Sequence, residues 1–203
     1  MLKVHAICYY RGMEDGWPDA WRETDFKVHN LVEAVRNEPV QGDDEIHTTG
    51  GKSSALQFAS QFLVKAMRNV GYDKATIIPV PSSTHVTPEG DFTSLRIARA
   101  VAEQDSAFTC APVLYFAKPV PQSAVGGRRT ATAIRVNLRS EGLGALGRVV
   151  LLDDISTTGA HLKAAAAYLS DKGIKVEDAF VVARIADHVP DNMFRVPALV
   201  LAP

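Results

Sequence analysis

The sequence has little cysteine, no long apolar run and almost no net charge. Its two cysteines, Cys8 and Cys110, lie far apart and show no metal-ligand spacing, which favours a reduced, cytoplasmic protein. No stretch reaches the roughly 18 apolar residues of a membrane span, and the opening MLKVHAICYYRG is too short and polar for an export signal. A formal net charge of −1 gives no general reason to expect binding to nucleic acid or to an anionic membrane.

The pattern that is present is that of an α/β protein. The chain has 203 residues, of which 46% are hydrophobic, and this is enough for one domain with a substantial core. Strand-like apolar runs alternate with helix-like segments, which predicts a largely parallel sheet flanked by helices. We expect strands at 3–10, 75–81, 111–117, 148–154, 176–186 and 197–202, and helices at 26–37, 53–69, 94–104 and 161–173.

One stretch between these elements is long and polar. Residues 118–147 contain glycines and arginines, and a loop of this length in a compact domain is usually functional or mobile.

The segment VVLLDDISTTGA, residues 149–160, combines features that point to a ligand. Its apolar run ends on Asp153 and Asp154, which should therefore emerge at the carboxyl edge of the sheet, where ligands bind in open parallel sheets. The turn that follows leads into a helix, whose first amides can surround an anion. Together these features indicate a sugar phosphate, with carboxylates on neighbouring hydroxyls. The alternative is an ordinary capped turn, because Asp, Ser and Thr commonly begin helices.

The stretch from Val149 to His161 resembles the PRPP-binding motif of type I phosphoribosyltransferases. The resemblance implies that family's fold over about Lys74–Ala186, with a small hood from the terminal segments. It makes Asp153 and Asp154 the ligands of the ribose hydroxyls and of Mg²⁺. It also implies PRPP or a nucleotide as ligand, a nitrogen acceptor, and a possible homodimer. The 5′-phosphate would be bound by Ser156, Thr157, Thr158, Gly159, Ala160 and His161.

Within that family the chain is most similar to the ComF-like branch, which is associated with DNA uptake. The resemblance rests on IIPVPSS, on PQSAVGGRRTATAIRVNLR, on the segment that begins DDISTTGA and on VVARIA. It implies that Ser82 and Ser83 contact pyrophosphate, although these serines also suit an ordinary polar loop. The zinc ribbon of that branch is missing, since residues 1–70 have a different composition. We expect residues 1–70 to supply the hood and accessory elements, and residues 71–203 the core and C-terminal tail.

Two positions of the motif depart from purine salvage enzymes. Thr157 stands where an acid often handles a base proton, and a threonine hydroxyl does not do so near neutral pH. His161 stands where a threonine often binds phosphate, and a neutral imidazole can still donate one hydrogen bond there. Phosphate binding is therefore expected, and purine salvage is disfavoured.

Transfer of a phosphoribosyl group also requires cations on the leaving pyrophosphate. Arg128 and Arg129, beside a Gly-Gly pair in the long polar stretch, are the first candidates, and Arg135 is the next. Arg128 and Arg129 also suit a solvated surface pair.

Three functions remain open at this point. The first is a Mg²⁺-dependent phosphoribosyltransferase that releases pyrophosphate. The second is a non-catalytic PRPP or nucleotide sensor that uses the same site, since fold alone does not establish catalysis. The third is an accessory role in DNA uptake, against which the balanced charge argues. The acceptor is not readable from the sequence.

Overall fold

A computed structural model describes residues 1–11, 21–36, 47–48, 51–52, 55–120, 130–186 and 190–202. The strands are β1 (Leu2–Tyr10), β2 (His47–Thr48), β3 (Gly51–Lys52), β4 (Ala75–Pro79), β5 (Phe108–Cys110), β6 (Leu114–Phe116), β7 (Leu138–Ser140), β8 (Val149–Ser156), β9 (Val176–Ile185) and β10 (Leu199–Leu201). The helices are α1 (Glu23–Arg36), α2 (Ala55–Asn69), α3 (Thr93–Gln104), α4 (Ala131–Arg135) and α5 (Ala160–Asp171). Among these helices, none combines the length and apolar character needed to cross a membrane.

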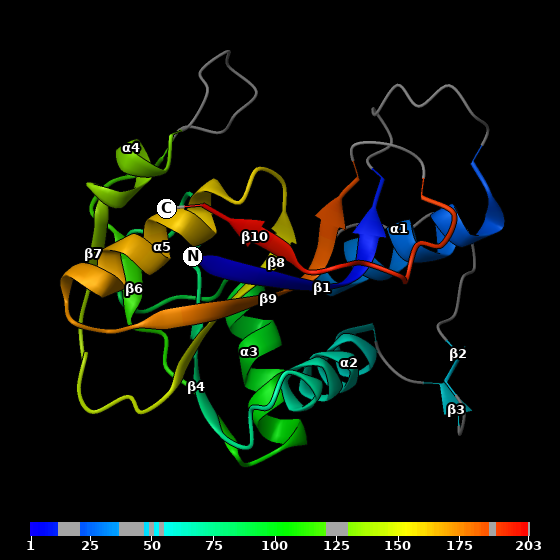
Figure 1. Ribbon diagram of the computed structural model, residues 1–203, viewed down its shortest axis with the longest axis horizontal. Helices are drawn as coiled ribbons and strands as arrows, with labels where there is room; N and C mark the ends of the chain where they lie inside the picture. Colours follow the sequence, from blue (N-terminus) through cyan, green and yellow to red (C-terminus); the bar gives the residue numbers. More distant parts are fainter. Residues whose placement is uncertain are drawn as a thin grey trace.

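The main sheet has six strands in the order β10-β1-β9-β8-β4-β5 (Figure 1). All neighbouring pairs are parallel except β1 and β10. Helices pack on the sheet, so the expected α/β architecture with a largely parallel, helix-flanked sheet is confirmed. The antiparallel pair aligns Leu2 with Leu201, which brings the two ends of the described chain together.

Strand β1 lies inside this sheet, between β10 and β9. The first strand of the N-terminal segment, residues 1–70, is thus part of the same sheet as strands from residues 71–203. The hood role expected for residues 1–70 stays a prediction.

The strand expected at 111–117 is divided differently in the structure. The edge strand next to β4 is β5, which ends at Cys110, whereas β6 pairs with β7 in a separate antiparallel ribbon. Pro112 explains the break, because proline has no N–H for a sheet ladder. Ala111 donates the last backbone hydrogen bond to Ile77 O, at 2.9 Å, and the chain then leaves the sheet.

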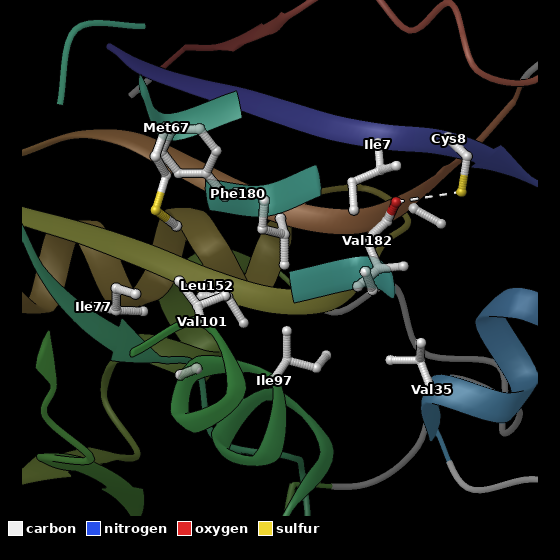
Figure 2. Packing of buried hydrophobic residues seen from close by; sticks show 14 of the residues in the cluster. Ile7, Cys8, Val35, Met67, Ile77, Ile97, Val101, Leu152, Phe180 and Val182 are labelled. Carbon is white, nitrogen blue, oxygen red and sulfur yellow. Dashed lines mark hydrogen bonds between the residues drawn. The ribbon is translucent and has the colours of Figure 1, made fainter. Parts of the chain in front are cut away.

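The core has two parts, one on each face of the sheet. Val150 and Leu152 of β8 point into a cluster with α1, α2 and α3, part of which Figure 2 shows around Phe180 and Val182. Val149 and Leu151 point the other way, into a cluster that includes apolar residues of α4 and α5. Because both faces of β8 are buried, its sequence is apolar without alternation up to Leu152. The first polar side chains on β8 are Asp153 and Asp154.

Candidate functional site

Asp153 and Asp154 lie where β8 loses one of its neighbours. Strand β4 pairs with β8 only as far as Leu152, with one further bond from Val80 N to Leu152 O at 2.8 Å. Strand β9 continues to pair with β8 up to Ser156, so the strand expected to end at Asp154 runs two residues further. The two carboxylates therefore stand beyond the end of β4, at the carboxyl edge of the sheet.

The side chains of Asp153 and Asp154 contact different elements on the two faces of the sheet. Asp153 lines a cavity on the α5 side, together with Ile134 of α4. Asp154 faces α1, where its Oδ2 lies 3.4 Å from Arg36 Nε. This divergence follows from the alternation of side chains along a strand. Each carboxylate is fixed by the next backbone amide: Asp154 N donates to Asp153 Oδ1 at 3.0 Å, and Ile155 N donates to Asp154 Oδ1 at 2.8 Å.

The environment of Asp153 disfavours its charge. Burial raises the pKa of Asp153 well above its usual value, and the neighbouring Asp154 carboxylate raises it further. A carboxyl group with a raised pKa can be protonated, and it can then donate as well as accept a hydrogen bond. Such a group suits a polar, hydroxyl-bearing ligand.

The turn after β8 leads directly into α5. Gly159 is the N-cap of this helix and has a φ of 70°, a left-handed backbone conformation that residues other than glycine rarely adopt. Lys163 N donates to Gly159 O at 2.9 Å, which closes the first helical turn. The first amides of α5 have no partner further back in the helix, so the positive end of its dipole faces the turn.

The cavity has a volume of about 80 Å³ and is lined by residues 155–162 with Asp153 and Ile134. The structure thus brings together Asp153 and all six residues expected to hold phosphate, namely Ser156, Thr157, Thr158, Gly159, Ala160 and His161. Asp154 does not line this cavity.

Ser156 is the most informative of these residues. It is only 3% exposed, and its Oγ has no hydrogen-bond partner within the described part of the chain. Most buried hydroxyls are hydrogen-bonded, and leaving one unpaired costs on the order of 1–3 kcal/mol. A buried, unpaired hydroxyl in the wall of a cavity calls for a polar group inside it.

The loop that holds Ser82 and Ser83 begins at the same edge of the sheet, directly after β4. Ser82 O accepts from His85 N at 2.9 Å, and Ser83 O accepts from Val120 N at 2.8 Å. These bonds fix the turn, while the Ser82 side chain stays exposed with Thr84 Oγ1 3.4 Å from its own Oγ. The loop therefore presents the Ser82 hydroxyl to solvent, and neither Ser82 nor Ser83 is among the described residues that line the cavity.

The structure describes only one of the three cationic candidates, Arg135. Arg128 and Arg129 lie outside the described residues. Arg135 forms an ion pair with Asp171, the last residue of α5, whereas the cavity lies at the first turn of that helix. The structure therefore does not bring Arg135 to the phosphate turn.

Sequence reasoning missed Arg36, which approaches Asp154 from the end of α1. The Glu33-x-x-Arg36 spacing predicts a local pair on a helix, and that pair is present, with Arg36 Nη1 3.3 Å from Glu33 Oε1. No signal in the sequence indicates that α1 ends beside β8.

The chain matches no protein-family model and no curated protein. Solved structures similar to it include UMP synthase from Leishmania donovani, at 18% identity with a TM-score of 0.42 over 78% of this chain. The chain spans only 31% of that protein. An orotate phosphoribosyltransferase from Aeropyrum pernix is 21% identical with a TM-score of 0.45, and the match covers 78% of this chain and 80% of that one.

A hypoxanthine phosphoribosyl transferase from Trypanosoma cruzi is 13% identical with a TM-score of 0.39, and the match covers 73% of this chain and 85% of that one. All three identities are below 25% and all three TM-scores below 0.5, so these similarities assign no function to this chain.

Proposed function

We propose that the cavity between Asp153 and the first turn of α5 binds the 5-phosphoribosyl group of PRPP or of a nucleotide, and that the protein is a phosphoribosyltransferase. Ser156 lines that cavity, and its buried Oγ has no hydrogen-bond partner among the residues that the structure describes; this is the observation that carries the proposal. A phosphate oxygen accepts a hydrogen bond from this hydroxyl and from the first amides of α5, and the helix dipole adds to the attraction.

In this proposal the two acids recognise the ribose. Asp153, in the cavity wall, and Asp154, the next residue of β8 just outside the cavity, would accept hydrogen bonds from the neighbouring 2′- and 3′-hydroxyls of a sugar that reaches over the sheet edge. The phosphate turn follows directly on β8, which suits a small sugar with hydroxyls on its ring and a phosphate on the exocyclic C5. The Asp154 carboxylate would also place negative charge near C1′.

The reaction breaks the bond between C1′ and the pyrophosphate oxygen and forms a bond between C1′ and the nitrogen of the acceptor. The electron pair of the broken bond leaves with pyrophosphate, and the acceptor releases its N–H proton to solvent. C1′ becomes positively charged in the transition state, so nearby carboxylates stabilise it. Ser82 and Ser83 donate hydrogen bonds to the departing pyrophosphate in this scheme. Arg128 and Arg129 remain the proposed cations for it.

The two carboxyl groups at the sheet edge fit a Mg²⁺ ion whose remaining ligands would come from the substrate and from water. Mg²⁺ prefers oxygen ligands and is commonly held by one or two carboxylates together with substrate phosphates and water. Asp153 and Asp154 supply such carboxylates, and the described residues contain no cluster of three or more His, Cys, Asp or Glu side chains that would form a closed protein site. When bound, the ion would neutralise charge on the leaving pyrophosphate.

The test is release of pyrophosphate from PRPP and Mg²⁺ in the presence of a panel of bases and amines, followed by ³¹P NMR. We expect turnover with one acceptor class and none without an acceptor. Saturable binding of PRPP without turnover on any acceptor would favour the sensor function instead. Absence of PRPP binding would contradict the proposal and the ComF-like assignment together.

A further inference from the structure

Arg36 approaches one of the two proposed sugar ligands from a different part of the chain. Its Nε lies 3.4 Å from Asp154 Oδ2, and the two side chains are 34% and 25% exposed. Arg36 is the last residue of α1, and Asp154 is near the end of β8. This contact joins the N-terminal segment to the carboxyl edge of the sheet.

The guanidinium is itself held by a second acid. Arg36 Nη1 lies 3.3 Å from Glu33 Oε1, and the Glu33 side chain is only 11% exposed. Tyr10, the last residue of β1, donates its hydroxyl hydrogen to the same Glu33 oxygen at 2.5 Å. A polar chain therefore runs from β1 through Glu33 and Arg36 to Asp154.

The carboxylate of Asp154 is consequently oriented from two directions. Its Oδ1 accepts the backbone amide of Ile155 at 2.8 Å, and its Oδ2 faces Arg36. Each carboxylate oxygen can accept more than one hydrogen bond, so both retain capacity for a ligand. A carboxylate fixed in this way offers its remaining acceptor positions in set directions, as recognition of a specific pair of hydroxyls requires.

We propose that Arg36 is a positioning residue that holds Asp154 in the orientation needed to bind the ribose diol, with Glu33 and Tyr10 holding Arg36 in turn. The inference rests on the proposed function, since it needs Asp154 to be a ligand of the sugar. It gives the N-terminal segment a defined part in sugar recognition. The alternative is that Arg36 and Asp154 form an ordinary surface ion pair with no part in ligand binding. Such partly exposed pairs are common and often contribute little even to stability.

The experiment compares two phosphate esters that differ only in the diol, ribose 5-phosphate and 2,3-dideoxyribose 5-phosphate. Their affinities are measured by calorimetry for the wild-type protein, for Arg36→Gln and for Arg68→Gln. Arg68 is a matched control, because it also pairs with an aspartate, Asp105, at 2.5 Å and is 37% exposed, but it lies on α2. Glu33→Gln is the second variant, since it keeps an acceptor for Tyr10 and removes the charge that holds Arg36.

We expect the wild-type protein to prefer ribose 5-phosphate by about tenfold or more, as for a hydrogen bond to a charged group. Arg36→Gln should reduce that preference by roughly threefold to tenfold, as expected when one hydrogen bond to the ligand is lost or weakened, and leave the affinity for the dideoxy compound unchanged. Glu33→Gln should reduce it less, and Arg68→Gln not at all.

If Arg36→Gln keeps the full preference, or lowers both affinities equally, the role of Arg36 is overturned while the sugar-phosphate site stands. A wild-type protein without any preference for the diol overturns both proposals.

Discussion

Leu201 of β10 occupies the space into which a side chain on Gly159 would project. A Cβ added to Gly159 would lie 2.5 Å from Leu201 Cδ1, closer than real side chains approach. The glycine at the N-cap of α5 is thus favoured by two independent constraints, its positive φ and the closeness of Leu201 on the strand β10. The C-terminal strand thereby helps to shape the proposed phosphate site.

Gly159→Ala should therefore destabilise the protein by about 2–5 kcal/mol, since left-handed backbone costs about 1–2 kcal/mol and overpacking about 1–3 kcal/mol. Chemical denaturation measures this loss. Leu201→Ala removes the clashing atoms, so the double variant should lose less stability than the two single changes together. Strict additivity would show that Leu201 does not limit the turn.

Ser156→Ala should change stability and ligand affinity in opposite directions. The substitution removes a buried hydroxyl that has no partner in the described part of the chain, so the free energy of unfolding should stay the same or rise slightly. Affinity for ribose 5-phosphate should fall by roughly tenfold or more, because the hydroxyl would donate to a charged group. Denaturation and calorimetry on the same preparations give both quantities, and an unchanged affinity would remove Ser156 from the site.

His85 should make the protein sensitive to mild acid. Burial lowers the pKa of His85, whose ring packs on Phe92 at a centroid distance of 4.3 Å. The folded state therefore binds this proton less readily than the unfolded state, in which the pKa is about 6.5. The contribution of neutral His85 is fully present above that value and is lost as the pH falls below it, down to the folded pKa.

The measurement is the free energy of unfolding at pH 7.5 and pH 5.5 for the wild-type protein and for His85→Asn. Between pH 7.5 and pH 5.5 the wild-type protein should lose more free energy of unfolding than the variant. The difference between the two proteins should not exceed about 1.4 kcal/mol per pH unit, the most that one proton can contribute. Equal losses in both proteins would assign the acid sensitivity to other groups, such as the carboxyls at the sheet edge.

The cysteines should be inert in the native protein. Burial raises the pKa of Cys8 to about 12 and that of Cys110 to about 11. The Cys8 thiol also donates to Val182 O at 3.4 Å, as Figure 2 shows. Since the thiolate is the reactive form, a chromogenic disulfide reagent at pH 8 should label neither thiol quickly until the protein is unfolded. Fast labelling of Cys8 in the native state would contradict its placement.

The sequence predicted the β8–α5 unit well because its determinants are local. The apolar run, the two acids, Gly159 and the alanine-rich helix follow one another along the chain, and each has a clear conformational preference. The strand at 111–117 was wrong in its extent, since Pro112 ends the ladder with β4 after Ala111. The approach of Arg36 to Asp154 depends on the spatial order β1-β9-β8, which no local pattern encodes.

The most direct test of the sugar-phosphate assignment is a calorimetric titration of the protein with PRPP and Mg²⁺, repeated for Asp153→Asn, Asp154→Asn and the control Arg68→Gln. We expect saturable binding at one site in the wild-type and control proteins. Each aspartate substitution should weaken binding by about tenfold or more, since each replaces a carboxyl group that would bind a ribose hydroxyl. Wild-type binding no tighter than that of inorganic pyrophosphate, or equal binding by the aspartate variants, would contradict the assignment.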